Sequence, residues 1–332
     1  MIPSDLWWNY VPAGIAIQSN LVQQIMAGGC VLLDASRLPW MSELSLLVQN
    51  QILSRDPELN WNEIDASALA GQDPVDYLRY YFNPDQLPIR NMILQNLRAL
   101  RSCCWVRNIP ESEIHGWIQL VRELFGGKNK SNFRLVLEVS PGIAKGIGKV
   151  SFVDAKIERF DIYYFALSIL ASERLYNNLR EYAATLCAEL AGGDVELCCN
   201  LCKSIDSVLK DPLACSITGC DESQLKQLVC RAQTRSISPL VDIGRLKLIS
   251  LFRKRIEDIL PQQDDYGNIL DDVNNIELRH LVYFSQHSLL SLNPQEKEML
   301  YRLYHARNTI SNLDILSYDK IHELFHTLDS LS

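Results

Sequence analysis

Long apolar runs are absent from this sequence. No window of the 332 residues approaches the roughly 20 consecutive apolar residues that a helix needs to cross a bilayer. The opening segment, MIPSDLWWNYVPAG, also lacks the basic start and the apolar stretch of a secretory signal peptide. These two absences predict a cytoplasmic protein with no membrane partner.

An excess of positive charge is also lacking, because 32 Lys and Arg face 40 Asp and Glu, for a formal charge of −8. A dedicated nucleic-acid surface needs a basic face for phosphates, so the charge does not indicate nucleic acid as a partner. A local basic patch on the folded surface remains an open alternative. The densest basic run, residues 245–255, carries Leu246, Ile249, Leu251 and Phe252 and predicts an amphipathic helix whose cations are solvated or paired with the chain's own acids.

Ten cysteines without a secretory signal predict reduced thiols rather than a disulfide framework. The spacing Cys199-x2-Cys202-x12-Cys215-x4-Cys220 leaves a zinc site open as an alternative, since four thiolates complete a tetrahedron. However, residues 195–203 (VELCCNLCK) have the pattern of a helix interior, where free cysteine behaves as a small hydrophobic residue. We therefore expect core thiols, no bound metal and no cofactor.

The first half of the chain alternates short apolar runs with helical patterns, which is typical of a parallel α/β sheet. From about residue 161 onward, strand signals give way to amphipathic segments, and residues 256–275 have the composition of a loop. The sequence thus predicts an α/β N-terminal domain at 1–175, followed by helical regions at 176–262 and 263–332. Strands are expected at 30–34, 62–67, 103–109, 133–139 and 150–157, and helices at 41–53, 74–82, 84–100 and 112–125.

The first predicted strand, a loop and the helix from residue 41 have the order that opens a P-loop domain. A working loop needs glycines, a lysine and backbone N–H groups to hold the phosphates. Residues 35–40 contain none of these glycines or lysines. Ser36, Arg37, Pro39 and Trp40 stand there instead, and Pro39 has no N–H to offer. The strand expected to supply a magnesium-linked acid ends in Arg107-Asn108, so both parts of the chemistry are missing.

On this element order, the segment from about Leu6 to Ala171 resembles the AAA+/STAND group of P-loop ATPases. The resemblance implies a P-loop-like fold with a degenerate nucleotide loop, kept as a scaffold. An unrelated doubly wound α/β domain is the alternative.

The segment LYRLYHARNTISN near the C-terminus resembles the C-terminal helix of HEPN domains, whose signature places a histidine a few residues after an arginine. The resemblance falls on Arg307, Asn308 and Asn312. Histidine suits proton transfer at a ribose hydroxyl, and arginine stabilises phosphorane charge. Because an amide cannot accept a proton near neutral pH, Asn312 implies an inactive version. We expect the three residues near the beginning of one helix, and bracing of neighbouring helices is the alternative role.

These features predict a non-enzymatic scaffold or regulatory subunit that binds other proteins, mainly subunits of the same system. The pairing of ATPase-like and HEPN-like parts resembles accessory proteins of bacterial conflict and anti-phage systems. A HEPN-type ribonuclease, or a module that binds nucleotide or nucleic acid without hydrolysis, remains the alternative.

Overall fold

The computed structural model describes residues 2–36, 38–69, 71–82, 101–125, 133–139, 151–153, 156–264 and 266–331. The predicted helix at 84–100, the loop at 140–148 and Arg37 lie outside these ranges. The chain forms two compact units, Met1–Asp161 with Gly193–Val195, and Ile162–Gly192 with Glu196–Ser332. The three-part division stays a prediction, and its boundaries at 175 and 262 both fall inside the second unit.

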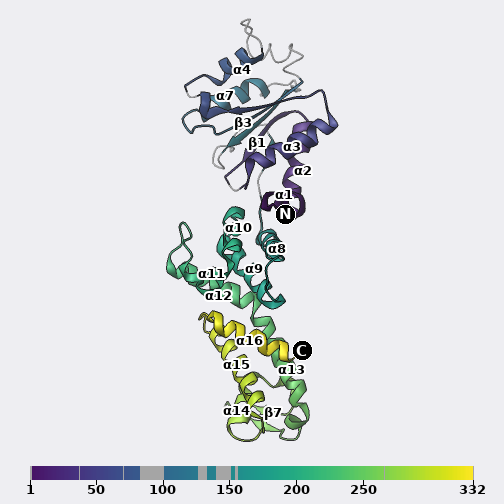
Figure 1. The fold of residues 1–332 in the computed structure, drawn as a ribbon, viewed down its shortest axis with the longest axis vertical. Coiled ribbons are helices and arrows are strands. Elements are labelled where there is room, and N and C mark those ends of the chain that lie inside the picture. The colour runs from purple at the N-terminus through teal and green to yellow at the C-terminus, as the bar shows by residue number, and fades with distance from the viewer. Residues whose placement is uncertain are drawn as a thin grey trace. The chain divides into compact units, whose positions relative to one another are not determined.

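A parallel sheet forms the centre of the first unit (Figure 1). Its order is β2-β3-β4-β1-β5, and each described strand pair is parallel. The predicted α/β domain with a parallel sheet, followed by a helical half, is confirmed. The strands are β1 (Gly29–Asp34), β2 (Asn60–Asp65), β3 (Ser102–Arg107), β4 (Arg134–Val139) and β5 (Ser151–Val153).

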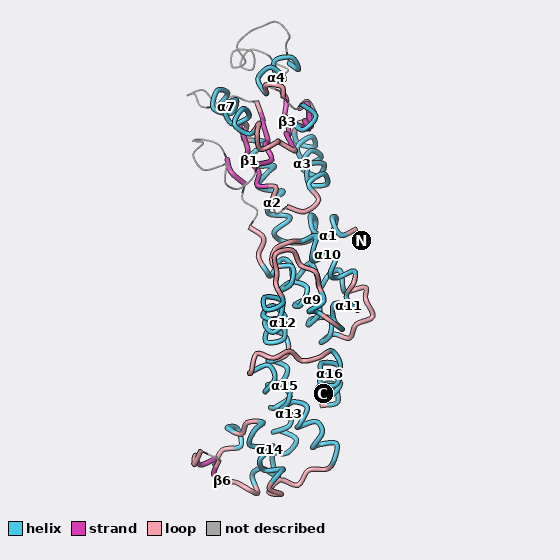
Figure 2. Tube along the Cα trace, turned by 90° about the vertical axis from the view of Figure 1, so that its left-hand side faces the viewer, coloured by secondary structure: helices cyan, strands magenta, loops and turns pink. Residues whose placement is uncertain are grey.

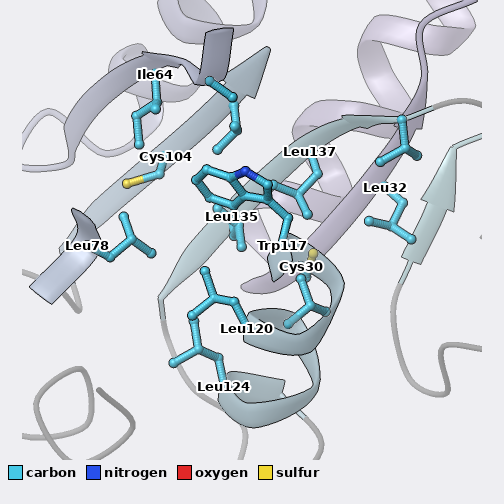
Figure 3. Packing of buried hydrophobic residues seen from close by; sticks show 14 of the residues in the cluster. Cys30, Leu32, Ile64, Leu78, Cys104, Trp117, Leu120, Leu124, Leu135 and Leu137 are labelled. Atoms are coloured by element: carbon cyan, nitrogen blue, oxygen red, sulfur yellow. The ribbon is translucent and has the colours of Figure 1, made fainter. Parts of the chain in front are cut away.

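One face of the sheet is covered by α4 (Pro74–Phe82) and α7 (Ile114–Phe125). Successive strand residues point to opposite faces, so Cys30 and Leu32 share this face with Leu135 and Leu137 of the neighbouring strand. Figure 3 shows Trp117 of α7 packed among them, and its side chain is 1% exposed. Burial of apolar side chains of this size contributes about 1.5–3 kcal/mol each, which holds helix and sheet together.

The remaining helices of the first unit are α1 (Pro3–Tyr10), α2 (Pro12–Met26) and α3 (Met41–Arg55). Helix α2 packs on β1, β4 and β5, and α1 packs on α2. This contact requires a glycine, because a Cβ at Gly14 would lie 2.3 Å from the Trp7 carbonyl oxygen. A short 3₁₀ turn, Ala66–Leu69, follows β2.

Helices build the second unit, as the amphipathic segments predicted (Figure 2). One departure is a small antiparallel hairpin inside the predicted loop at 256–275, formed by β6 (Gln262–Gln263) and β7 (Ile269–Leu270). The helices are α8 (Arg159–Leu170), whose first turn belongs to the first unit, α9 (Asn177–Ala191), α10 (Val195–Lys203), α11 (Ile205–Lys210), α12 (Glu222–Ser236), α13 (Ser238–Glu257), α14 (Leu278–Gln286), α15 (Pro294–Ser311) and α16 (Tyr318–Ser330), with 3₁₀ turns Pro212–Ala214 and Val273–Asn275.

A buried carboxylate joins α9 to α12. Glu189 is 4% exposed and forms ion pairs with both Arg231 and Arg235, which lie one helical turn apart on α12. A buried carboxylate is tolerated only when it is paired, and here two guanidinium groups share it.

The basic run at 245–255 is helical, as predicted, within α13. The predicted apolar face is only partly correct. Ile249 and Phe252 are buried, whereas Leu246 and Leu251 are 55% and 54% exposed. The physical reason is that α15 and α16 cover a different stripe of the helix, centred on Gly244, where a Cβ would lie 2.8 Å from Leu303 and 2.9 Å from Leu328.

Among the described residues, no helix combines the length and the apolar composition required for a membrane span.

The fully buried side chain of Gln233 on α12 clamps the connection between α15 and α16. Its amide nitrogen donates to the Leu316 carbonyl at 2.9 Å, and its amide oxygen accepts from the Leu316 N–H at 2.8 Å. The same nitrogen also lies 3.4 Å from the Tyr182 hydroxyl of α9. One side chain thereby satisfies a buried backbone pair and joins three elements.

We predict that Gln233→Ala lowers the free energy of unfolding by about 2–4 kcal/mol, because the Leu316 N–H and carbonyl lose their buried partners. Urea denaturation followed by circular dichroism measures this change. Gln227→Ala, at an exposed position on the same helix, is the matched control and should change stability little. Equal effects of the two variants on stability would contradict the proposed role of the Gln233 hydrogen bonds.

Candidate functional site

The loop between β1 and α3 is the one predicted to be a degenerate nucleotide loop, and it begins with two residues, Asp34 and Ser36, that bond to each other. Asp34, 5% exposed at the end of β1, accepts hydrogen bonds from the Ser36 N–H at 3.0 Å and the Ser36 hydroxyl at 2.6 Å. A phosphate would need such N–H groups turned toward it. Here the Ser36 N–H donates instead to the Asp34 carboxylate, whose negative charge repels phosphate.

The rest of this loop offers no replacement cradle among its described residues. Leu38 and Pro39 are buried. Trp40 is the N-cap residue of α3 and has a left-handed backbone conformation, with φ 46°. Its side chain makes no capping hydrogen bond to the first turn of the helix. Arg37, the one cation of the loop, lies outside the described residues.

The carboxyl ends of β2 and β3 carry charges that pair with one another. Arg107 donates to Glu63, and Glu63 also accepts from the Ser45 hydroxyl of α3. Asp65 accepts from Ser67 and from the Asn108 amide, and these bonds, the Ser67 side chain first, lower the pKa of Asp65. Ligands of parallel α/β sheets bind at this edge. The described polar groups here are already engaged with each other.

Glu138 is a site residue that the sequence pattern did not identify. It lies on β4 and accepts from the Trp105 indole N–H of β3 at 2.7 Å. Burial raises its pKa, although the indole bond and the charge of Arg107 oppose that rise. A Glu inside the apolar run FRLVLEV was the available signal, and the structure explains it as one partner of a cross-strand polar pair.

The HEPN-like residues lie at the end of α15, which corrects the expectation that they begin a helix. Asn312 is the C-cap, and its N–H donates to the Asn308 carbonyl at 3.0 Å. The next N–H groups, of Leu313 and Asp314, donate to Ile310 and Thr309, which completes a Schellman ending. Asn308 and Asn312 therefore terminate a helix.

Arg307 makes an ion pair with Glu277, the N-cap residue of α14, at 3.5 Å. Glu277 also pairs with Arg279 at 3.3 Å, and Arg279 lies 3.9 Å from Asp264. Asp264 is 4.0 Å from His280, a side chain that is 6% exposed. This network brings a histidine near Arg307, but the histidine caps α14 through its Nδ1 and is buried. Arg307 braces α14 against α15.

An open pocket of about 370 Å³ lies between α15 and α16. Arg302 and His305, three residues apart and hence on one face of α15, line it with Lys320 of α16. The two cations are already paired, Arg302 with Glu298 at 2.5 Å and Lys320 with Glu323 at 3.1 Å. The i, i+3 spacing of Arg302 and His305 is visible in the sequence, but it does not distinguish a pocket from a solvent-exposed helix face.

The cysteines of the zinc alternative do not converge on one point. Cys202 interacts with Cys187 and Cys198, whose thiols donate to it and lower its pKa. Burial raises the pKa of Cys199 and of Cys215. Within the described ranges, no three Cys, His, Asp or Glu side chains are grouped so that they could hold a metal ion.

No family model matches this chain, and no curated protein matches it. Among solved structures, the chain is similar to the ORC2 protein of Aeropyrum pernix in its ADPNP–ADP complexes. The identity is 12% and the TM-score 0.31, over 98% of this chain and 97% of that one. The parallel α/β architecture described above depends on the strands and their pairing and not on this similarity.

We predict that the purified protein shows no saturable binding of Mg-ATP, because Asp34 occupies the loop where the phosphates would lie. Isothermal titration calorimetry tests this directly, and thermal unfolding with and without nucleotide is the second readout, since a ligand that binds the folded state raises the melting temperature. Saturable binding with a micromolar dissociation constant would contradict the closed loop.

Proposed function

We propose that this chain is a non-catalytic scaffold or regulatory subunit that binds other proteins. The observation that carries the proposal is the loop after β1, in which Asp34 and Ser36 bond to each other at the position of a nucleotide's phosphates. An AAA+-like sheet with such a loop retains the architecture of the ATPases without the groups that hold ATP.

A protein-binding role also needs an accessible apolar surface, and α13 supplies one. Ile243, Leu246 and Leu251 are 47%, 55% and 54% exposed. Ile243 and Leu246, three residues apart, share one side of the helix, and Leu251 lies at the edge of that side. Exposed apolar side chains that lie together are typical of interaction sites. We call these three residues the α13 face.

The expected partners are subunits of the same assembly. The resemblance to accessory proteins of bacterial conflict and anti-phage systems suggests a defence assembly as the setting, and this remains part of the proposal.

To test the scaffold role, a tagged chain is purified from its native host, co-eluting proteins are identified, and the complex is rebuilt from purified components. We predict that Leu246→Glu weakens the rebuilt complex by at least about tenfold, since it removes one buried leucine from the interface. Leu46→Glu is the matched control, because Leu46 on α3 is also 55% exposed. A complex that tolerates Leu246→Glu would exclude the α13 face, and a chain without any stable partner would overturn the scaffold role.

A HEPN-type ribonuclease is the second candidate, and the pocket between α15 and α16 is the observation that favours it. His305 is exposed there beside Arg302 and Lys320, which are the side-chain types that metal-independent RNA cleavage requires. Because Glu298 and Glu323 neutralise both cations, we favour the scaffold.

We predict that the protein does not cleave single-stranded RNA in the presence of EDTA. Arg307→Ala should cost less than about 1 kcal/mol of stability, because Arg307 and Glu277 are 38% and 42% exposed. Gel analysis of labelled RNA and urea denaturation give the two readouts. If the protein cleaves RNA, and a folded His305→Ala variant does not, the ribonuclease function would replace the proposed scaffold function.

A further inference from the structure

Leu313, which follows the C-cap of α15, is unusual both in its backbone conformation and in the exposure of its side chain. It adopts φ 56°, a left-handed conformation that favours glycine or asparagine at this position of a Schellman ending. Its side chain is nevertheless a large apolar one, and it is 68% exposed. The backbone around it is held, since the Leu313 carbonyl accepts from the Cys230 thiol at 3.1 Å. An unfavourable residue in a fixed and exposed place points to a contact outside the fold.

Leu313 lines a groove of about 430 Å³ along α12. The groove is basic, because Lys226, Arg231 and Arg235 line it and their side chains are 50%, 52% and 42% exposed. The acids beside them are Asp314, paired with Lys226, and the single buried Glu189, shared by the two arginines. Three cations thus face two carboxylates. The groove suits an apolar anchor flanked by acidic groups.

The same chain carries a segment of this description at the tip of the β6–β7 hairpin. Tyr266 and Ile269 are 78% and 73% exposed, the highest values among the large apolar side chains that the structure describes. Asp271 and Asp272, both exposed, follow directly.

The described residues of the tip are held by contacts within the chain. The Asp264 carboxylate accepts from the N–H groups of Tyr266 and Asn268 at 2.9 and 2.8 Å. The Tyr266 ring lies 5.3 Å from the Arg279 guanidinium. A preorganised aromatic anchor loses little conformational entropy on binding.

We propose that the β6–β7 tip of one copy of this chain docks into the α12 groove of a second copy. Within the second unit the hairpin lies at the α14 end and away from α12, so the tip reaches a groove on another molecule (Figures 1 and 2). The two surfaces differ, so the contact is heterologous. In a pair of copies, one keeps a free groove and the other keeps a free tip, so further copies can add to form a chain or a ring. This assembly rests on the proposed scaffold function and specifies one partner, the chain itself.

Analytical ultracentrifugation of the full chain over a range of concentrations tests the proposal. We expect the average mass to rise with concentration and the association to weaken as salt is added, because screening reduces the charge attraction. Leu313→Asn should weaken self-association about tenfold or more while leaving the fold intact, since asparagine suits the left-handed conformation. Tyr266→Ser should have the same effect from the other side, and Leu46→Asn, at a similarly exposed leucine, should have none.

Mixing the two defective variants separates a heterologous contact from any other. Leu313→Asn retains its tip and Tyr266→Ser retains its groove, so an equimolar mixture should form a complex of two chains that cannot grow further, although each variant alone is monomeric. A wild-type chain that stays monomeric at every concentration, unchanged association of Leu313→Asn, or a mixture that stays monomeric would each overturn the proposal. None of these outcomes affects the co-elution test of the scaffold role.

Discussion

The buried amide of Gln233 is the interaction on which the second unit depends. A side chain with no access to water must find partners for its oxygen and its nitrogen, and the N–H and carbonyl of Leu316 supply both. This pair fixes where the α15–α16 connection crosses α12. Leu313 and Asp314 are placed by the same crossing, against Cys230 and Lys226. The α12 groove therefore exists because one helix position is a buried amide and not an apolar residue.

The first unit is a parallel α/β sheet whose carboxyl edge is lined by side chains that bond to one another. In parallel α/β sheets, ligands approach the carboxyl ends of the strands, where loop N–H groups and side chains are free to receive them. In this chain Asp34, Glu63 and Asp65 reach that edge, and each is engaged by a neighbouring hydroxyl, guanidinium or amide. The edge is consequently a set of internal contacts that stabilise loops. The proposed scaffold role is consistent with an edge whose described polar groups bond within the chain.

The candidate sites were only partly accessible from the sequence. The missing glycines and lysine of residues 35–40 could be read directly, because a phosphate loop is a local motif. That Asp34 closes the loop could not, since a terminal Asp of a strand is equally compatible with solvent. Arg307 and Asn308 resembled a catalytic pair, yet their roles depend on Glu277, thirty residues earlier, and on the ending of α15 at Asn312. The same holds for Cys202, whose partners include Cys187 on another helix.

By itself, the sequence determined the class of the protein and most of its elements. A short continuous apolar run such as CVLLD is typical of a buried strand, and the spacing of apolar residues in VELCCNLCK reflects the 3.6-residue period of a helix, so both segments indicate their structure locally. The tertiary structure decided which faces are covered. In the helical pattern, Leu246 and Leu251 have the spacing of core residues. However, α15 and α16 pack against the stripe of α13 that contains Gly244, so Leu246 and Leu251 stay exposed to solvent. The hairpin at 262–270 was hidden for a related reason. Its strands are two residues long, too short for any periodicity, and its turn is held by hydrogen bonds to Asp264 rather than by an apolar pattern.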